Sequence, residues 1–355
     1  MKLVVFGLTL SSSWGNGHAT LWRGLIRALA RRGHEVVFFE RDVPYYAAHR
    51  DLNELPGAQL TLYASWHSVL ERARQQVGDA DVLIVTSYCP DAIAAARLIF
   101  DQESSALRVF YDLDTPVTLA RLDAGDRVDY LPEGGLSGFD LVLSYTGGEA
   151  LRTLQHRLGA RRVAPLYGHV DPDRHHPVEV ERGPGAALSY LGTYARDRQE
   201  AVERLFIGPA RARPAQRFVL GGAGYPEDFP WQPNIWFVRH VAPAGHCAFF
   251  CGSRLTLNVT RADMAAMGFC PSGRLFEAAA CGTPIMTDSW VGLDEFFEPG
   301  QEILTASSTL EAMDALDLSS SVLARIARAA RERVLAQHTS QARAAQLIDT
   351  LESVR

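Results

Sequence analysis

Residues 271–288 read PSGRLFEAAACGTPIMTD, and this stretch predicts a turn, a short helix and a buried strand. Ser272 stands where a helix N-cap accepts backbone N–H bonds, and Gly282 stands where a helix ends. A helix that begins beside Arg274 presents free N–H groups, a positive dipole end and a guanidinium group, all of which suit a phosphate. One turn later, Glu277 can accept both hydroxyl hydrogens of a ribose. The pattern indicates a nucleotide site, and a surface ion pair between these two side chains is the alternative.

The run SGRLFEAAACGTP, residues 272–284, resembles the nucleotide-sugar-binding signature of GT-B glycosyltransferases. The resemblance is closest to the CgeB-like (spore maturation protein B-like) branch, with a glycosyl transferase group 1-like C-terminal domain. It covers almost the whole chain and is strongest from residue 258 to residue 282. Many retaining members carry a second acid eight residues before the ribose-binding glutamate, and this chain has Phe269 there, so the two-acid pattern is incomplete. The nucleotide contacts expected at this helix start are Ser272, Gly273 and Glu277, the last for the ribose.

Composition limits the classes of protein and partner. The chain has 355 residues, 47% of them hydrophobic, which is enough for two buried cores, so we expect two domains. Its 35 basic and 41 acidic residues give a net charge of −6 without a basic block, which argues against nucleic acid as a partner. The five cysteines are an odd number without paired-motif spacing and indicate free thiols in a reducing cytosol. We therefore expect a cytoplasmic protein.

The N-terminal segment imitates a secretion signal, because Lys2 precedes an apolar run over residues 3–10. The run is short, lacks a cleavage pattern of small residues and leads into a glycine-containing loop, so we expect a strand instead. No stretch approaches the roughly 20 apolar residues of a membrane helix. A peripheral membrane contact, which is common where acceptors are lipid-linked, stays open.

The first half of the chain begins as a strand, a glycine loop, a helix and a second strand. The loop, residues 11–18, is neither a G-x-G-x-x-G fingerprint nor a P-loop. Polar groups on a loop after a parallel strand are nevertheless where open α/β sheets bind ligands. Asn16 and His18 are therefore candidates for the acceptor side of a site, and a plain turn at Asn16 with a helix cap at His18 is the alternative.

A later strand, residues 107–111, ends in a pair of carboxylates, Asp112 and Asp114. At a strand's carboxyl end, either one could act as general base on an acceptor hydroxyl. Their spacing also matches the Asp-x-Asp motif of metal-dependent glycosyltransferases, but the surrounding α/β pattern argues against that other fold. The alternative role is local, with Asp114 capping the turn that follows.

The junction between the predicted domains falls at residues 163–172, which end in a turn of the Gly-x-Val-Asp kind. We expect an N-terminal acceptor-side domain over 1–170, a nucleotide-sugar-binding domain over 178–340, and a last helix over 341–355 that packs back on the first domain. Three histidines and two aspartates gather near the junction, but their spacing matches no zinc pattern and the neighbouring prolines indicate an extended connector, so no metal site is predicted. They are His169, Asp171, Asp173, His175 and His176.

The second domain repeats the strand, loop and helix pattern. Gly192 ends its first strand, and Arg196 and Arg198 open the following helix, an arrangement that suits a diphosphate. A solvated charged first turn is the alternative. By resemblance, the base lies between the next two strand ends, residues 217–220 and 234–241. The residues expected around it are Gly222, His240 and Val241.

The strand over residues 255–261 carries Asn258 and Arg261 at its end, so these groups are expected to converge with Arg274. Cationic groups at adjacent strand ends can neutralise a leaving diphosphate without a metal. For Arg261 the alternative is a salt bridge to Asp263 or another carboxylate.

Together these features predict an α/β protein of the GT-B type, with two Rossmann-like domains facing across a cleft. The expected activity is transfer of a hexose from a nucleoside diphosphate donor to an unidentified acceptor, by a monomer or homodimer without cofactor or metal. A nucleotide-sugar epimerase and a non-catalytic nucleotide- or sugar-binding protein are the alternatives. The expected catalytic residues are His18, Asp112, Asp114, Arg261 and Arg274.

Overall fold

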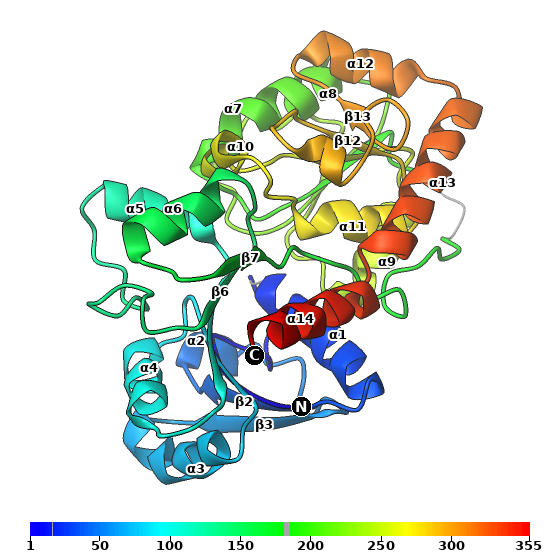
Figure 1. The fold of residues 1–355 in the computed structure, drawn as a ribbon. Helices are drawn as coiled ribbons and strands as arrows, with labels where there is room; N and C mark the ends of the chain where they lie inside the picture. The colour runs from blue at the N-terminus through cyan, green and yellow to red at the C-terminus, as the bar shows by residue number, and fades with distance from the viewer. Residues whose placement is uncertain (16, 181–184) are drawn as a thin grey trace. The chain divides into compact units, whose positions relative to one another are not determined.

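The chain forms two compact units, described here from a computed structural model that covers residues 1–15, 17–180 and 185–355 (Figure 1). Unit 1 consists of Met1–Tyr167 and Ser340–Arg355, and unit 2 of Gly168–Thr339. The chain therefore leaves unit 1 after Tyr167 and returns to it for the last helix. Asn16, predicted on the acceptor side, and residues 181–184 of the predicted linker lie outside the described residues.

Unit 1 is built on a sheet of seven strands, all of them parallel to their neighbours, in the order β3-β2-β1-β4-β5-β6-β7. The strands are β1 Lys2–Gly7, β2 Glu35–Arg41, β3 Ala58–Tyr63, β4 Val82–Thr86, β5 Leu107–Asp112, β6 Leu141–Ser144 and β7 Val163–Pro165. Central strands of such a sheet are covered on both faces, which explains their nearly continuous apolar runs. Phe6 on β1 and Phe110 on β5, for example, have no exposed surface.

Apart from the C-terminal helix, the helices of unit 1 connect consecutive parallel strands, as the βαβ pattern requires. They are α1 Gly17–Arg31, α2 Pro44–Ala47, α3 Trp66–Gly78, α4 Ala92–Asp101, α5 Thr115–Asp123, α6 Glu149–Leu158 and the C-terminal α14 Ser340–Val354. Figure 1 shows α14 beside α1, and Gln346 on α14 donates to the carbonyl of Pro165 at the end of β7 at 2.9 Å. The last helix thus belongs to the core of unit 1.

Unit 2 has a second parallel sheet, of six strands in the order β10-β9-β8-β11-β12-β13. Its strands are β8 Leu188–Leu191, β9 Phe218–Gly221, β10 Ile235–Val238, β11 Thr256–Asn258, β12 Ile285–Thr287 and β13 Leu304–Thr305. Its α-helices are α7 Gln199–Val202, α8 Gly208–Ala212, α9 His246–Cys251, α10 Ala262–Met267, α11 Gly273–Ala280, α12 Thr309–Asp317 and α13 Ser320–Gln337. Among the described residues, no helix is both long enough and apolar enough to span a bilayer.

In both sheets, the order in which strands are added changes direction beside the first strand. In unit 1 the chain builds outward from β1 through β2 and β3, and then from β4 on the other side; in unit 2 the same happens between β8 and β11. Ligands of open α/β sheets bind outside the carboxyl ends of the strands at such a reversal. The topology of each unit therefore predicts a ligand site at the carboxyl ends of its strands, beside its first strand.

At the carboxyl ends of the unit 2 strands, one close backbone contact leaves room only for glycine. Gly222, directly after β9, has φ 147°, and a Cβ placed on it would lie 1.9 Å from the carbonyl oxygen of Gly192 after β8. We expect Gly222→Ala to lower the free energy of unfolding by about 2 to 4 kcal/mol, because backbone would have to move. Gly245→Ala is the matched control, since its Cβ would meet only Val241 Cγ1 at an ordinary 3.5 Å. Equal unfolding midpoints for the two variants in urea would refute this prediction.

Candidate functional site

Helix α11 carries the predicted nucleotide residues and ends as the sequence analysis expected. It runs from Gly273 to Ala280 after the N-cap Ser272, and Gly282 follows in a left-handed conformation at φ 72°. The Ser272 hydroxyl makes no cap hydrogen bond, so only its predicted position is confirmed. The apolar face of α11 is buried in unit 2, which leaves Arg274 and Glu277 on the remaining face.

Arg274 lies among cationic and aromatic groups at the end of β8. Burial lowers the pKa of its guanidinium group, and the nearby charge of Arg198 lowers that pKa further. Arg198 follows β8 and donates to the carbonyl of Thr193 at 3.4 Å, while Tyr225 donates to the carbonyl of Gly192 at 2.9 Å. Two like charges held close together in a partly buried place favour an anionic ligand between them.

Glu277 faces two histidines that the sequence analysis did not connect with it. Its carboxylate oxygens lie 3.3 Å from His246 Nδ1 and 3.9 Å from His175 Nε2, and 14% of its side chain is exposed. Burial alone would raise the pKa of Glu277, but the positive charge that His175 and His246 carry when protonated, together with that of Arg274, outweighs burial and holds that pKa well below its usual range. Glu277 is therefore a carboxylate at neutral pH, as an acceptor for two hydroxyl groups must be.

Arg261, predicted to face the diphosphate, is ion-paired. Its Nε lies 3.2 Å from Asp197 Oδ2, and the same oxygen accepts from the amide of Ala262. The alternative of a salt bridge is thus observed, with Asp197 as the partner in place of Asp263. Asp197 lies between Arg196 and Arg198 on the short helix after β8, so this pair also joins that helix to the segment after β11.

The other residues predicted to bind the nucleotide-sugar donor lie at the same carboxyl ends of the strands. Gly192 and Gly222 touch through the close approach described above, and the amide of Gly222 donates to the carbonyl of Val238 at the end of β10. His240 is exposed, and the carbonyl of Val241 accepts from His246 Nε2 at 3.3 Å. Asn258 is buried and donates to Thr287 Oγ1 on the neighbouring strand, so its amide binds β11 to β12.

Unit 1 has its own polar cluster at the carboxyl ends of its strands, where the strand order changes direction. Tyr88, after β4, donates to Asp114 Oδ2 at 2.9 Å, and its ring centroid lies 5.9 Å from that of His18 at the start of α1. Tyr88 has φ 63°, one of only two positive values among the described non-glycine residues. Strained backbone of this kind is commonest at functional sites. The cluster brings together His18, Asp112 and Asp114, all predicted, and Tyr88, which was not.

The two aspartates differ in exposure. Asp112 has no exposed surface and accepts from the amide of Asp114, whereas Asp114 is half-buried. Burial raises the pKa of Asp112 to about 6 and lowers the pKa of His18 to about 4. At neutral pH the cluster therefore holds a neutral imidazole together with the Asp112 carboxylate, whose basicity is increased, which suits proton abstraction from a hydroxyl group.

The raised pKa of Asp112 predicts a pH dependence of stability. Folded Asp112 keeps its proton up to about pH 6, but the unfolded residue loses it near its ordinary pKa of 3.8, so unfolding releases a proton between these values. Stability contributed by this group is therefore full below about pH 4 and is lost as the pH rises towards 6, by about 3 kcal/mol. In urea unfolding, the difference between wild type and Asp112→Asn should fall across this window. A difference that is flat, or that rises, would contradict the assignment.

The loop that leads to His18 is held by a buried carboxylate that the sequence analysis missed. Glu40, at the end of β2, is 1% exposed and accepts four hydrogen bonds from residues 9–11, at 2.6 to 2.9 Å. A carboxylate bonded by so many donors fixes the loop after β1 against the end of β2. Its only sequence signal was an acid at the end of an otherwise apolar strand.

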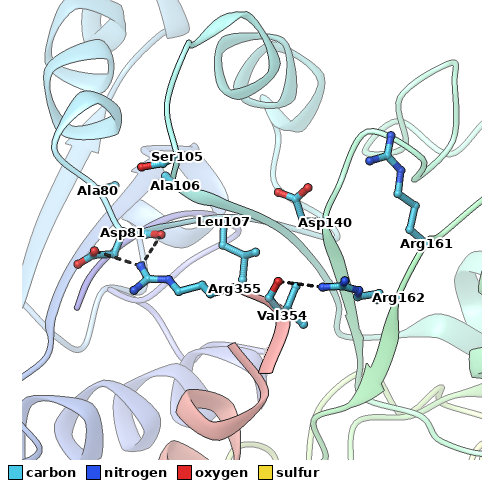
Figure 2. Close-up of a pocket in the computed structure, with 10 residues that line it drawn as sticks. All are labelled: Ala80, Asp81, Ser105, Ala106, Leu107, Asp140, Arg161, Arg162, Val354 and Arg355. Atoms are coloured by element: carbon cyan, nitrogen blue, oxygen red, sulfur yellow. Dashed lines mark hydrogen bonds and ion pairs between the residues drawn. The ribbon is translucent and has the colours of Figure 1, made fainter. Parts of the chain in front are cut away.

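A hollow of unit 1 lies at the amino ends of its strands, opposite the polar cluster. It has a volume of about 610 Å³ and is lined by residues before β4, β5, β6 and β7 together with the C-terminal residues Val354 and Arg355 (Figure 2). Two of its three arginines contact the chain itself, because Arg355 pairs with Asp81 at 3.1 Å and Arg162 donates to the carbonyl of Val354 at 2.8 Å. A location at the amino ends of the strands does not fit a ligand site of this fold.

Part of the chain matches a known protein family. Residues 198–349 match the family model described as "Glycosyl transferase-like", so the chain carries a glycosyltransferase-like domain that includes α11. No curated protein matches the chain.

Solved structures resemble the whole chain in fold. A sucrose-phosphate synthase (tll1590) from Thermosynechococcus elongatus has a TM-score of 0.70 at 14% identity, over 100% of this chain and 99% of that one. Anabaena Alr3699/HepE in complex with UDP and glucose has a TM-score of 0.69 at 13% identity, over 99% and 100%. An alpha-glucosyltransferase in complex with UDP and a 13-mer DNA has a TM-score of 0.73 at 14% identity, over 99% of each chain. The fold is that of GT-B glycosyltransferases, with two Rossmann-like units, as expected.

Proposed function

We propose that this protein transfers a sugar from a nucleoside diphosphate donor to an acceptor hydroxyl group. The observation that carries the proposal is the face of α11, where Arg274 and the ionised Glu277 lie one helical turn apart beside the carboxyl end of β8. This helix belongs to the segment that matches a glycosyltransferase-like model. A cation and a carboxylate at that spacing can hold a phosphate and a ribose of the same nucleotide.

In this proposal the diphosphate lies against Arg274 and Arg198, with Arg196 and Arg261 at its margin. Their charges stabilise the leaving diphosphate, so no metal ion is needed for transfer. Ser272, Gly273 and Asn258 shape the same edge, and the base lies against Gly192, Gly222, His240 and Val241. UDP is the first nucleotide to test, because it is the one found in the structures of HepE and alpha-glucosyltransferase.

The acceptor side is assigned to the cluster of unit 1. Asp114 is the better general base of the two aspartates, because Asp112 is fully buried. Tyr88 orients Asp114 through its hydrogen bond, and His18 lies at the edge of the same cluster. The acceptor is left open: DNA is present with the alpha-glucosyltransferase, so a DNA oligonucleotide belongs in an acceptor panel despite the net charge of −6. Membership of the CgeB-like branch and a cytoplasmic location remain part of this proposal.

A binding protein without turnover is the second candidate, and Phe269 is the observation that favours it. Phe269 stands where many retaining members have an acid, and it has φ 48°. Its ring fills the space beside Gly292, where an added Cβ would lie 2.4 Å from the ring. The donor-side acid is thus replaced by an apolar side chain in a fixed position.

A thermal-shift screen followed by a transfer assay tests both candidates. Nucleoside diphosphates and their sugars should raise the melting temperature, since a ligand that binds only the folded state stabilises it. Release of nucleoside diphosphate that depends on an acceptor supports transfer, and binding without such release supports the second candidate. If no nucleotide among UDP, GDP, ADP and their sugars shifts the melting temperature, both candidates fail.

A further inference from the structure

Three side chains of unit 2 lie close together, and no hydrogen bond between them accounts for this arrangement. His175 lies near the start of the unit, His246 opens α9, and Glu277 lies on α11. One ligand atom from each falls within 4.8 Å of the other two, and all three residues are buried or half-buried. Since 71 and 31 residues separate them in the chain (246 − 175 and 277 − 246), the fold alone brings them together.

The orientation of His246 leaves a lone pair directed at the carboxylate. Its Nε2 lies 3.3 Å from the carbonyl oxygen of Val241, and since a carbonyl only accepts, Nε2 carries the hydrogen. In the neutral ring Nδ1 is then an acceptor, and it faces Glu277 Oε2 at 3.3 Å, where neither atom has a hydrogen-bond partner. Two facing acceptors repel unless a positive group lies between them. Histidines that bind metals are oriented in this way, with the other ring nitrogen donating to a backbone carbonyl.

A proton on His246 Nδ1 would remove the repulsion from Glu277, but it would leave His175 without a partner. Both of its ring nitrogens are buried without a hydrogen-bond partner, and Nε2 is 3.9 Å from Glu277 Oε1, which is too long for a hydrogen bond. A buried polar group without a partner costs about 1 to 3 kcal/mol. An ion shared by all three side chains would satisfy His175 as well as His246.

We propose that His175, His246 and Glu277 bind one divalent transition-metal ion of the zinc type. Two imidazole nitrogens and one carboxylate oxygen are ligands of zinc and cobalt, whereas magnesium and calcium prefer oxygen alone. Tetrahedral zinc bonds place ligand atoms roughly 3.3 Å apart. His246 Nδ1 already lies 3.3 Å from Glu277 Oε2 and His175 Nε2 lies 3.9 Å from Glu277 Oε1, so small side-chain movements would bring the three ligand atoms, now within 4.8 Å of one another, to that spacing. Three protein ligands leave a fourth position open.

The neighbouring thiols have other partners. Cys247 follows His246 in the chain, but its Sγ donates to the carbonyl of Arg174 at 3.1 Å. Cys251 Sγ lies 3.5 Å from the carbonyl oxygen of Cys281. The expected ligand set is therefore two nitrogens and one oxygen, without sulfur.

The metal would compete with the nucleotide, an inference that rests on the proposed function. If Glu277 accepts the ribose hydroxyls, the same oxygens cannot bind an ion at the same time, so each ligand weakens the other by the same factor. The ion is then an inhibitor of donor binding and takes no part in sugar transfer.

Titration of chelator-treated protein with Co²⁺ tests the site without any nucleotide. We expect one equivalent of Co²⁺ to give visible d–d bands of tetrahedral N/O coordination, without the near-ultraviolet charge-transfer band of a thiolate, and Zn²⁺ to displace it. His175→Ala and His246→Ala should each weaken binding at least about tenfold. His156→Ala, an exposed histidine on α6, is the matched control and should bind as wild type does. Circular dichroism of the metal-free variants checks that each is folded, and His246→Gln replaces any variant that is not.

The proposal is overturned if wild type binds no Co²⁺, if both histidine variants bind it as tightly as wild type, or if a thiolate band dominates the spectrum. UDP titrated into chelator-treated protein by calorimetry tests the nucleotide site separately, so a missing metal site and a missing nucleotide site give different results. With both present, saturating Zn²⁺ should reduce UDP affinity at least about tenfold, in parallel with metal occupancy. Unchanged UDP affinity at full Zn²⁺ occupancy would overturn the competition.

Discussion

Glu277→Gln is expected to weaken the binding of a nucleoside diphosphate by roughly 30- to 150-fold. Hydrogen bonds to a charged group contribute about 1.5 to 3 kcal/mol each, and glutamine keeps one neutral acceptor of similar shape. The loss of about 2 to 3 kcal/mol converts to that change in Kd, since 1.4 kcal/mol is tenfold. The effect should be large because Glu277 is held as a carboxylate by His175, His246 and Arg274. Isothermal titration calorimetry with UDP in the presence of a chelator measures it without interference from metal.

Glu149→Gln is the matched control for this variant. Glu149 is an exposed carboxylate at the start of α6 in unit 1 and pairs with Arg152, so its charge is equal but its place is outside the proposed site. UDP affinity of the control should equal that of wild type. Should Glu277→Gln bind UDP as tightly as the control does, Glu277 would have no part in nucleotide binding.

Arg274→Met is expected to weaken UDP binding and to increase the stability of the protein without ligand. We expect UDP affinity to fall at least about 100-fold, because a guanidinium group that contacts a phosphate makes charge-assisted and often bidentate hydrogen bonds. The free energy of unfolding without ligand should rise by about 1 kcal/mol. Arg274 is desolvated next to the like charge of Arg198 and its Nε has no hydrogen-bond partner, so an apolar side chain of similar length removes a strained charge. Calorimetry and urea unfolding measure the two effects.

The control for this second variant is Arg204→Met. Arg204 is exposed and pairs with Glu200 on the preceding turn, so its removal should leave both UDP affinity and stability within experimental error. An Arg274→Met protein that unfolds more easily and still binds UDP would show that Arg274 has a structural role instead.

Much of unit 2 was predictable because its signals are local. The helix over 273–280 follows from an alanine run closed by Gly282. Strand ends and the polar residues that follow them are also local, which is why Asp112 and Asp114 could be placed at a sheet edge. Their difference in exposure could not be predicted, since it depends on how α5 and the loop after β4 pack around them.

The parts that sequence reasoning missed depend on long-range contacts. No spacing rule joins His175, His246 and Glu277, because three separate segments of the sheet's edge must fold before they meet. The partner of Arg261 was missed for the same reason, as Asp197 lies 64 residues away. Strand β3, at the edge of its sheet, and helix α3 were not singled out because residues 58–78 carry a weaker apolar pattern than the buried strands.

The central claim is that unit 2 binds a nucleoside diphosphate through α11 and the carboxyl ends of its strands. A crystal structure of the protein with UDP tests it most directly. The account predicts ribose hydroxyls within hydrogen-bond distance of the Glu277 carboxylate and phosphate oxygens within that distance of Arg274. Ordered UDP bound elsewhere, with Glu277 still facing only its two histidines, would contradict it.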